Sequence, residues 1–533
     1  MTELEHRTPD PVWNAWGTAE AASPVSGQVR DLLEQGLGVP RRDTPSVPRS
    51  AVRLGESRLS EPVRAELNRI VGAEHVRTDA ESRLLHAGGK STPDLLRRRA
   101  GDARAAPDAV VLPGSPEQVS AVLARCAELR VAVVPFGGGT SVVGGVEPER
   151  GGFDAVLAVD LRRLAALVEL DAESGTATLQ AGLRAPEAEE LLAAHGCTLG
   201  HFPQSFEHAS IGGFAATRSS GQASAGYGRF DAMVVRVRVA TPRGELDLGR
   251  APASAAGPDL RQLFLGSEGA LGIITEVTLR VRPVPEEVVP EAWAFPDFAG
   301  GSAALRELAQ AEALPTVARL SDEAETAVNL AAAHDVGGGQ VAGGCLLITR
   351  CEGPRIAVRE RMRALLEEAG GSSLGAGPAQ DWERGRYRGP HLRDALLDVN
   401  ALVETLETAT SWSRLQETRD AVTAALTEAL REQGTPPLVL CHLSHAYPTG
   451  ASLYFTVVCG RGEEPVEQWW RAKRAAGAAI TRCGATISHH HAVGLDHREW
   501  LTEEIGELGV EVLRAVKSAV DPVGILNPGK LIP

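Results

Sequence analysis

Three consecutive glycines, Gly137 to Gly139, directly follow the apolar run VAVVPF and precede Thr140 and Ser141. The apolar run predicts a short buried strand, and glycines at its end let the backbone approach another group closely. N–H groups and hydroxyls that converge in this way can bind the oxygens of a diphosphate. A tight turn is the alternative interpretation, because glycine-rich strand ends are common and PFGGGTS differs from the GxGxxG pattern of dinucleotide-binding folds.

Predicted strands and helices alternate on both sides of this segment. PDAVVLP predicts a strand, and SPEQVSAVLARCAELR predicts an amphipathic helix with Ser115 as its N-cap and Pro116 in its first turn. Further strands, among them the run MVVRVRVATPRGELDLG, and one helix, over residues 155–285, complete an α/β unit. Beyond residue 286, long helices rich in Ala, Leu, Glu and Arg alternate with strands such as GGCLLITRC and SLYFTVVCG, which indicates a second domain.

Composition describes an ordinary globular protein. A chain of 533 residues with 43% hydrophobic positions can bury a large core in two or three domains. The net charge of −15 is spread along the chain and argues against a nucleic-acid partner. The seven cysteines lack metal-binding spacing, no run is apolar enough to span a membrane, and the N-terminus lacks a signal peptide. We expect a cytoplasmic homodimer that acts on a small-molecule or lipid substrate, with peripheral membrane contact left open.

His489, His490 and His491 form an unusual triplet. Three adjacent imidazoles cannot all face an apolar core at either helical or strand periodicity, so at least one must lie in polar surroundings. A histidine-rich surface loop or a weak metal site would be the simplest interpretation. The triplet alone does not provide tetrahedral metal geometry, so we assign no metal and favour anion binding.

Several motifs occur in a fixed order: VWNAWG, PFGGGTSVVGG, the stretch from GHFPQSFEHASIGG to ATRSSG, LFLGSEGALG, LRDALLD, GASLYF and ISHHHAVG. Together they resemble the FAD-dependent vanillyl-alcohol-oxidase and p-cresol-methylhydroxylase superfamily, and within it most closely the alkyldihydroxyacetonephosphate (alkylglycerone-phosphate) synthases. The resemblance implies an α+β fold, with a two-subdomain PCMH-type FAD-binding domain and an α/β cap domain that has an antiparallel sheet and flanking helices. It also implies FAD as the cofactor. Because the glycine-rich loop offers no histidine for a covalent link, we expect non-covalent FAD.

The resemblance divides the chain into an N-terminal arm and helical region (1–105), the FAD-binding domain (106–286), the substrate-binding cap (287–485), and a C-terminal segment that returns to the FAD domain with the histidine triplet (486–533). By the same resemblance, the cofactor contacts are Pro135, Phe136, Gly137, Gly138, Gly139, Thr140, Ser141, Gln204, Ser205, Phe206, Glu207, His208, Ala209, Ser210, Thr217, Arg218, Ser219, Ser220, Glu268, Gly269, Ala270, Leu271, Gly272, Ile273 and Ile274.

Tyr454 lies in a predicted strand whose alternation sends Leu453 and Phe455 to the opposite face. By itself it could be a packed core tyrosine. The resemblance places it at the catalytic tyrosine of the synthases, so we assign it proton transfer at the substrate carbon, with His489, His490 and His491 as further catalytic residues.

Three arginines are further candidates. Arg393 could be a helix-surface arginine paired with an aspartate, but the resemblance places it on the substrate, where a guanidinium can bind a phosphate or carboxylate bidentately. Arg319 is a second candidate for substrate binding. Arg250 stands where the family has an arginine needed for activity, although the loop around it departs from the family pattern.

The resemblance implies a transferase that exchanges the acyl group of acyl-dihydroxyacetone phosphate for a long-chain alcohol in ether lipid biosynthesis. In that reaction flavin N5 captures the substrate as an adduct, Tyr454 removes a proton, and no net electron transfer occurs. The alternative is an oxidase or dehydrogenase of a D-2-hydroxy acid such as lactate, glycolate or 2-hydroxyglutarate. Those enzymes carry HxGDGNxH and EHGxG segments, where this chain has HLSHAYPTGASLYF and ISHHHAVG.

Two further observations bear on the function. A flavin-binding protein without catalysis would have no need for Tyr454, Arg393 and three histidines together. The family's HHHGVGK reads HHHAVGL here, which removes a glycine and a lysine beside the proposed anion site and leaves the head group of the substrate open.

Overall fold

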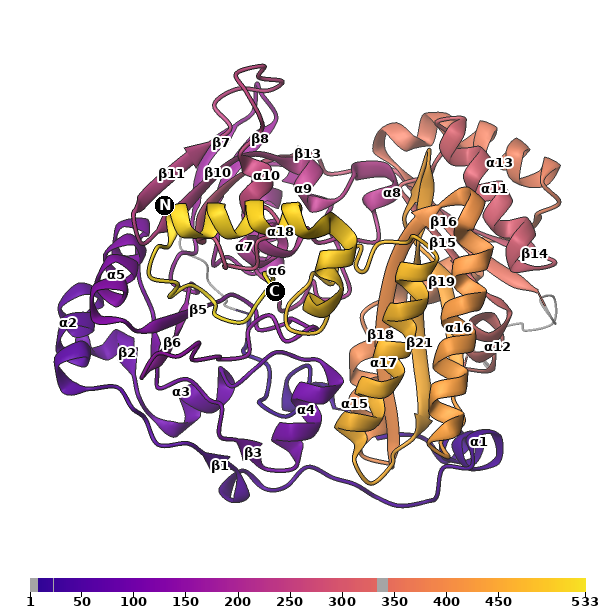
Figure 1. Cartoon of the computed structure of the whole chain (residues 1–533). Helices are drawn as coiled ribbons and strands as arrows, with labels where there is room; N and C mark the ends of the chain where they lie inside the picture. The colour runs from indigo at the N-terminus through magenta and orange to yellow at the C-terminus, as the bar shows by residue number, and fades with distance from the viewer. Residues whose placement is uncertain (1–7, 23, 333–343) are drawn as a thin grey trace.

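The computed structural model describes residues 8–22, 24–332 and 344–533, and it has two halves (Figure 1). The first half contains a four-stranded and a five-stranded sheet, and the second is built on one larger sheet. Helices and strands are mixed throughout, as the expected α+β fold requires. The domain limits at 105, 286 and 485 stay predictions.

The four-stranded sheet carries the glycine-rich loop. Its strand order is β2 (Val76–Arg77), β4 (Ala109–Val111), β6 (Val156–Asp160) and β5 (Ala132–Phe136). β4, β6 and β5 are parallel, and helix α5 (Pro116–Leu129) connects β4 to β5. The Ser115 hydroxyl accepts the N–H of Gln118, which confirms the predicted N-cap. The loop therefore begins at the C-terminal end of a parallel strand, a common place for ligand binding in α/β sheets.

The five-stranded sheet is antiparallel throughout its pairings. Its order is β11 (Gly244–Leu248), β10 (Val234–Thr241), β12 (Ile273–Arg280), β8 (Thr176–Gln180) and β7 (Leu167–Asp171). The run MVVRVRVATPRGELDLG, which we predicted as one strand, forms the β10–β11 hairpin instead. Residues 242 and 243 lie in the turn between the two strands. Helix α7 (Ile211–Thr217) packs on β12 and leads into the predicted cofactor segments.

The large sheet of the second half is antiparallel in all its pairings. Its order is β17 (Ser372–Gly375), β14 (Val288–Phe295), β16 (Cys345–Glu352), β15 (Val317–Ser321), β19 (Leu438–Leu443), β21 (Gly450–Gly460) and β18 (Ala401–Ser411), with β20 (Ala446–Tyr447) paired to β21. One face forms a core with the helices α11 (Phe298–Gln310), α13 (Arg359–Glu368), α16 (Leu415–Glu432) and α17 (Pro465–Arg482). The other face carries the polar side chains of the site.

The two ends of the described chain connect the halves. Beyond α17 the chain returns to the first half, where α18 (Leu501–Val520) lies on its surface and Leu526 bridges Val133 of β5 (Figure 1). Near the start, Lys90 Nζ donates to the carbonyl oxygens of Val12 and Ala15, both at 2.6 Å. The same arm reaches the second half, where the N–H of Trp16 donates to Asp394 Oδ2 at 2.5 Å. Sequence-distant segments thus hold the halves together.

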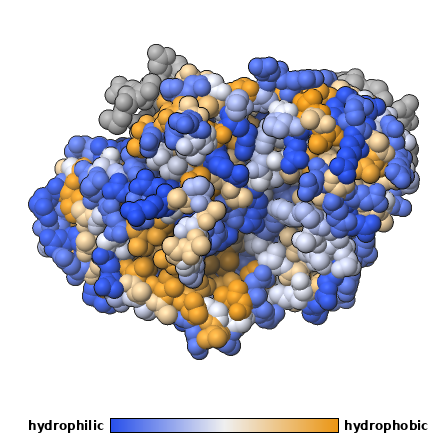
Figure 2. Space-filling view, turned by 90° about the horizontal axis from the view of Figure 1, so that it is seen from above, coloured by the Kyte–Doolittle hydropathy of each residue, from blue (hydrophilic) through white to orange (hydrophobic). Residues whose placement is uncertain are grey.

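The surface carries apolar side chains on α18. Ile505, Leu508 and Val512 are exposed, and a broad apolar patch appears in the view from above, on the side where α18 runs (Figure 2). No helix in the described ranges is long and apolar enough to cross a membrane.

Candidate active site

The glycine-rich loop packs tightly against the segment 204–210. A Cβ atom at position 137 would lie 2.3 Å from Ser210 Oγ, and one at position 138 would lie 2.2 Å from the carbonyl oxygen of His208. Gly139 has φ +65°, which side chains disfavour. The glycines are therefore required by the approach of a neighbouring chain segment as well as by any bound diphosphate.

The segments 204–210 and 268–274 meet at this loop, and the segment 217–220 follows a residue that bonds Glu268. A Cβ on Gly269 would lie 2.5 Å from Pro135 Cγ, and the N–H of Glu268 donates to the carbonyl of Ala216 at 2.9 Å, next to residues 217–220. Their surroundings fit a polar cofactor: in the part of the chain that the structure describes, His208 Nδ1, Ser220 Oγ and Ser267 Oγ are buried without a hydrogen-bond partner. Buried polar atoms normally have partners, so a bound molecule would satisfy them.

Two side chains in these segments face other groups. Arg218 Nη1 donates to Asp231 at 3.0 Å and Arg218 Nε to the carbonyl of Leu265, while the Glu268 carboxylate accepts the N–H groups of Val493 and Gly494. At these two positions, a cofactor would meet the backbone rather than the charged group.

The large sheet brings Tyr454 next to two polar residues by its register. Tyr454 of β21 pairs with Glu407 on β18 and with His442 on β19, and direct cross-strand partners share one face of a sheet. Leu453 and Phe455 are fully buried on the opposite face, as the alternation predicted. The ring of Tyr454 stacks on that of His442, with centroids 4.8 Å apart and an interplanar angle of 18°.

The histidine triplet lies over the same face and surrounds Glu407. The Glu407 carboxylate accepts the hydroxyl of Ser488 at 2.7 Å and the N–H groups of His489, His490 and His491 at 2.7, 3.2 and 2.9 Å. The rings of His490 and His491 lie 6.0 and 5.5 Å from that of Tyr454. One buried carboxylate thus holds the backbone of the triplet, while the His489 imidazole has the Tyr447 hydroxyl and the His490 ring as polar neighbours.

Burial sets the protonation of these groups. It lowers the pKa of His489 and His491 to about 3 and raises the pKa of Tyr454 to about 12. Burial opposes ionisation of Glu407, but the three histidines and the N–H of His491 hold its pKa well below the usual value. At neutral pH the site therefore combines neutral imidazoles, a protonated phenol and an ionised carboxylate.

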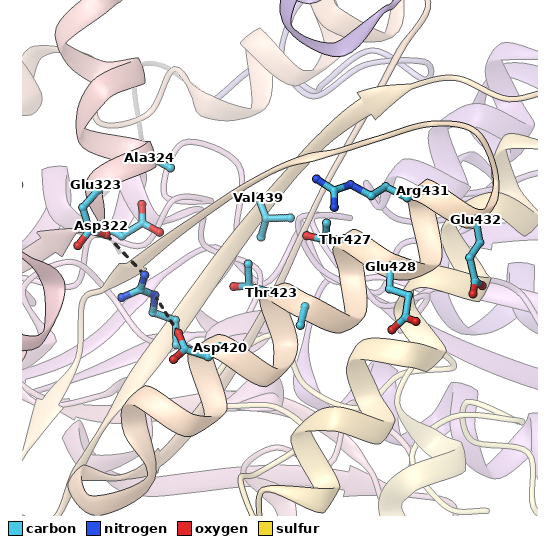
Figure 3. Close-up of a pocket in the computed structure, with 12 residues that line it drawn as sticks. Asp322, Glu323, Ala324, Asp420, Thr423, Thr427, Glu428, Arg431, Glu432 and Val439 are labelled. Carbon is cyan, nitrogen blue, oxygen red and sulfur yellow. Dashed lines mark ion pairs between the residues drawn. The ribbon is translucent and has the colours of Figure 1, made fainter. Parts of the chain in front are cut away.

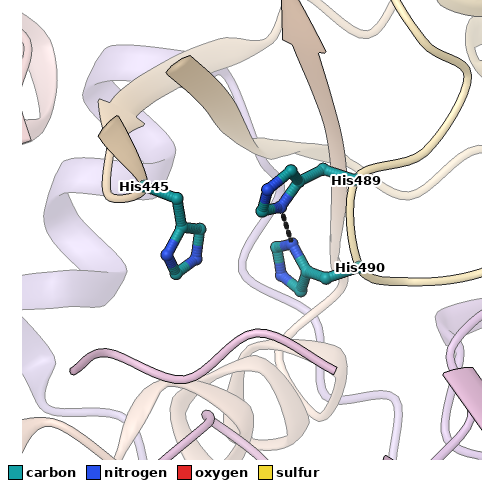
Figure 4. A group of neighbouring side chains, drawn as sticks. All are labelled: His445, His489 and His490. Carbon is teal, nitrogen blue, oxygen red and sulfur yellow. Dashed lines mark hydrogen bonds between the residues drawn. The ribbon is translucent and has the colours of Figure 1, made fainter. Parts of the chain in front are cut away.

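His445, His489 and His490 form a compact group whose ring nitrogens lie within 4.8 Å of one another (Figure 4). His489 Nδ1 lies 3.0 Å from His490 Nδ1, and His489 Nε2 lies 2.7 Å from the Tyr447 hydroxyl. Zinc bonds of about 2.1 Å would require three nitrogens around one point. Both nitrogens of His489 instead have hydrogen-bonding neighbours, which suits proton sharing, and the assignment of no metal stays a prediction.

The three candidate arginines have different surroundings. Arg319 joins the cluster, because its guanidinium contacts His442 at 2.9 Å and pairs with Glu325 at 2.7 Å. Arg393 is buried, where it donates to Asp394 and to the carbonyl oxygen of Lys90. Arg250 is exposed just beyond β11, at the edge of the five-stranded sheet, and no described hydrogen bond or ion pair joins it to the histidines. The geometry supports Arg319 most directly.

A cavity of about 760 Å³ lies away from these residues, between α12 (Glu323–Ala332), α16 and β19 (Figure 3). Charged residues of both signs line it, among them Asp322, Arg419 and Arg431. The Asp322 carboxylate already accepts the N–H groups of Glu325 and Cys441. The cavity contains no predicted site residue.

Sequence reasoning did not single out Glu407, His442, His445 or Tyr447. The HLSH spacing put two histidines near the end of a strand, which was an available signal. Glu407 was recognisable only as a carboxylate inside the strand LVETLETAT, and its role depends on which strand pairs with which.

Comparisons with known proteins identify the family. Residues 107–248 match the FAD binding domain family, and residues 284–531 match the C-terminal domain family of FAD linked oxidases. The alkyldihydroxyacetonephosphate synthase of Dictyostelium discoideum is 32% identical, over 98% of this chain and 93% of that protein. This chain belongs to the alkyldihydroxyacetonephosphate synthase family.

A solved structure of an alkyldihydroxyacetonephosphate synthase superposes on this family member with a TM-score of 0.85 and 30% identity, and the match covers 98% of this chain and 99% of that one. A mitochondrial D-lactate dehydrogenase of Arabidopsis thaliana is more distant, at 28% identity over 80% of this chain and 74% of that protein. As a member of the synthase family, the protein is an FAD-dependent enzyme.

Proposed function

We propose that this enzyme exchanges the acyl group of an acyl-dihydroxyacetone phosphate for a long-chain alcohol and so forms the ether bond of an alkyl lipid. The observation that carries the proposal is the likeness to the synthases over 98% of the chain. It includes the strand and the loop that bring Tyr454 next to His490 and His491. In the exchange a carboxylate leaves with its bonding electrons and the alcohol oxygen replaces it, so no electrons remain for an acceptor.

Residues 135–141, 204–210, 217–220 and 268–274 would hold the FAD. Bound FAD supplies an electrophilic ring system to the reacting carbon. The close contact of these segments and their unpaired buried polar atoms support this placement. The glycine-rich loop contains Gly, Thr and Ser and offers no covalent link, so non-covalent binding stays our prediction.

Tyr454 and the histidines would move the proton of the reacting carbon. With a pKa of about 12 the Tyr454 phenol is protonated at neutral pH, so it can act as a base only when its own proton passes on. His490 and His491 are its ring neighbours, and a neutral imidazole has one acceptor nitrogen that can take that proton. Burial lowers the pKa of both imidazoles and weakens them as bases, so the relay requires the bound substrate phosphate to raise their pKa.

The phosphate of the substrate would be bound by imidazole N–H groups of the triplet together with Arg319. Arg319 is already oriented by Glu325 and by His442, the ring that stacks on Tyr454. Arg393 would first have to release Asp394, and Arg250 would have to reach the site from an exposed segment. We therefore rank Arg319 above these two for substrate binding.

The test is an exchange assay. Purified holoenzyme is mixed with acyl-dihydroxyacetone phosphate and a labelled long-chain alcohol, without an electron acceptor. We expect label in a product that resists alkaline hydrolysis, as an ether does, with one fatty acid released per ether formed and no oxygen consumed. Turnover of a D-2-hydroxy acid with an acceptor dye, and no ether product, would show an oxidase or dehydrogenase instead.

A further inference from the structure

The loop 488–494, which carries the histidine triplet, is held by two buried carboxylates from different halves of the molecule. Glu407 of β18 accepts the Ser488 hydroxyl and the backbone N–H groups of residues 489, 490 and 491. Glu268, from the FAD-binding half, accepts the N–H groups of Val493 and Gly494 at 3.1 and 2.8 Å. Five of six consecutive N–H groups thus point at two carboxylates.

We propose that Glu407 and Glu268 are positioning residues, which fix the backbone of this loop so that the three imidazoles remain free for chemistry. The inference relies on the proposed function only in treating the triplet as catalytic. In the described ranges, the side-chain hydrogen bonds of both carboxylates go to this loop and none goes to Tyr454 or Arg319.

The pattern of donors supports this role. The side chain of Glu407 is fully buried, and in the described ranges its single ion-pair contact is His490 Nδ1 at 3.6 Å, beyond hydrogen-bonding distance. Its oxygens are otherwise occupied by backbone N–H groups and one hydroxyl. A buried carboxylate needs several donors, and here they all come from one loop. These hydrogen bonds therefore fix the position of the loop relative to Glu407.

Glu268 adds a link to the cofactor segments. Its own N–H bonds Ala216 in the same half, and its carbonyl oxygen accepts Asn527 Nδ2 at 2.6 Å. The residue is therefore fixed at its backbone by the FAD-binding half while its side chain holds the histidine loop. Glu268 therefore belongs to a cofactor segment and also holds the loop that carries the triplet.

Glu404 provides a matched control on the same strand. It is also buried, and it accepts two backbone N–H groups, those of Thr92 and Thr405 at 2.5 and 2.9 Å. It is three positions from Glu407, so it lies on the other face of β18 and holds none of the histidines. Both changes, Glu404→Gln and Glu407→Gln, replace a buried carboxyl group with an amide among N–H donors.

The first measurement needs no substrate. Holoenzymes of wild type, Glu407→Gln and Glu404→Gln are treated with diethyl pyrocarbonate, and the modification of residues 489–491 is followed by mass spectrometry. We expect the triplet to react about tenfold faster in Glu407→Gln, because the loop opens more often, and at the wild-type rate in Glu404→Gln. Equal rates in the two variants would overturn the proposal, whatever reaction the enzyme catalyses.

The second measurement is the rate of the exchange reaction. We expect kcat to fall by about 10²- to 10³-fold in Glu407→Gln and by less than about threefold in Glu404→Gln, with similar melting temperatures for the two. If Glu407→Gln fails to fold, Glu268→Gln takes its place, with the triplet's reactivity and the FAD content as readouts. Wild-type reactivity of the triplet in Glu268→Gln would contradict the role of that residue.

Discussion

Tyr454 is the residue on which the proposed chemistry depends, and its neighbours make a clean test possible. The change Tyr454→Phe keeps the ring that stacks on His442 and removes only the hydroxyl. We expect the exchange rate to fall by about 10²- to 10⁴-fold, the range of general acid–base groups, with FAD content and melting temperature close to wild type.

A packed core tyrosine would behave in the opposite way. Loss of its hydroxyl would then cost about 0.5 to 1.5 kcal/mol of the free energy of unfolding and leave turnover nearly intact. Exchange of the carbon-bound hydrogen of the substrate with solvent deuterium, measured in Tyr454→Phe, separates the two cases. An exchange rate equal to that of wild type would contradict a role of Tyr454 in proton transfer.

Ala492 is a position at which this chain departs from the family pattern, and the structure shows what the change does to the backbone. The family pattern HHHGVGK has a glycine where this chain has Ala492, and the structure gives this residue a φ of +74°. A side chain in this left-handed region of backbone conformation costs about 1 to 2 kcal/mol. The family pattern has glycine at this position because glycine avoids that cost. The departure from the family pattern is a conformational cost, in addition to any effect on the head group.

Individual site residues were predictable to different degrees. Tyr454 and His489–His491 followed from the motifs, because rare residue types stand in recognisable segments. Glu407 and His442 did not, because they meet Tyr454 only through the pairing of β18 and β19 with β21. Strand pairing is a non-local property that local periodicity does not encode.

The loop 488–494 is one of the segments that join the two halves, and at Gly494 it lies very close to the first half. Gly494 has φ +54°, and a Cβ there would lie 2.0 Å from the carbonyl oxygen of Val143, beside the glycine-rich loop. We expect Gly494→Ala to lower the free energy of unfolding by more than about 3 kcal/mol and to reduce FAD content, because backbone on both sides must move. Denaturant unfolding and flavin absorbance per chain measure both effects.

Gly506 is the matched control for this change. Its φ of +77° is equally unfavourable for a side chain, but a Cβ there would meet nothing within 4 Å. Gly506→Ala should therefore cost only the backbone strain, about 1 to 2 kcal/mol, and leave FAD content unchanged. Equal losses in the two variants would mean that the contact between the loops contributes nothing.

Elements with strong local signals were predicted well. The β4–α5–β5 unit followed from apolar runs and an N-cap at Ser115. The β10–β11 hairpin was missed, although Pro242 and Gly244, at the turn between its strands, are typical turn residues. The order of the large sheet joins strands more than a hundred residues apart, such as β15 and β19, and no local pattern specifies such pairings.

At the scale of the whole molecule, the site is assembled from both halves. The first half contributes the cofactor segments and Glu268, the large sheet contributes Tyr454, Glu407, His442 and Arg319, and the returning C-terminal segment contributes the histidines. The chemistry proposed for this arrangement uses FAD without net transfer of electrons. An enzyme that oxidises D-2-hydroxy acids would instead reduce its flavin in each turnover and need an electron acceptor to reoxidise it.

Anaerobic mixing, with the visible flavin band recorded, tests this claim most directly. We predict that acyl-dihydroxyacetone phosphate bleaches the band with release of fatty acid, and that a long-chain alcohol then restores it without any electron acceptor. D-lactate, glycolate and D-2-hydroxyglutarate should leave the band unchanged. Full reduction of the flavin by one of these hydroxy acids, with no response to acyl-dihydroxyacetone phosphate, would contradict the account.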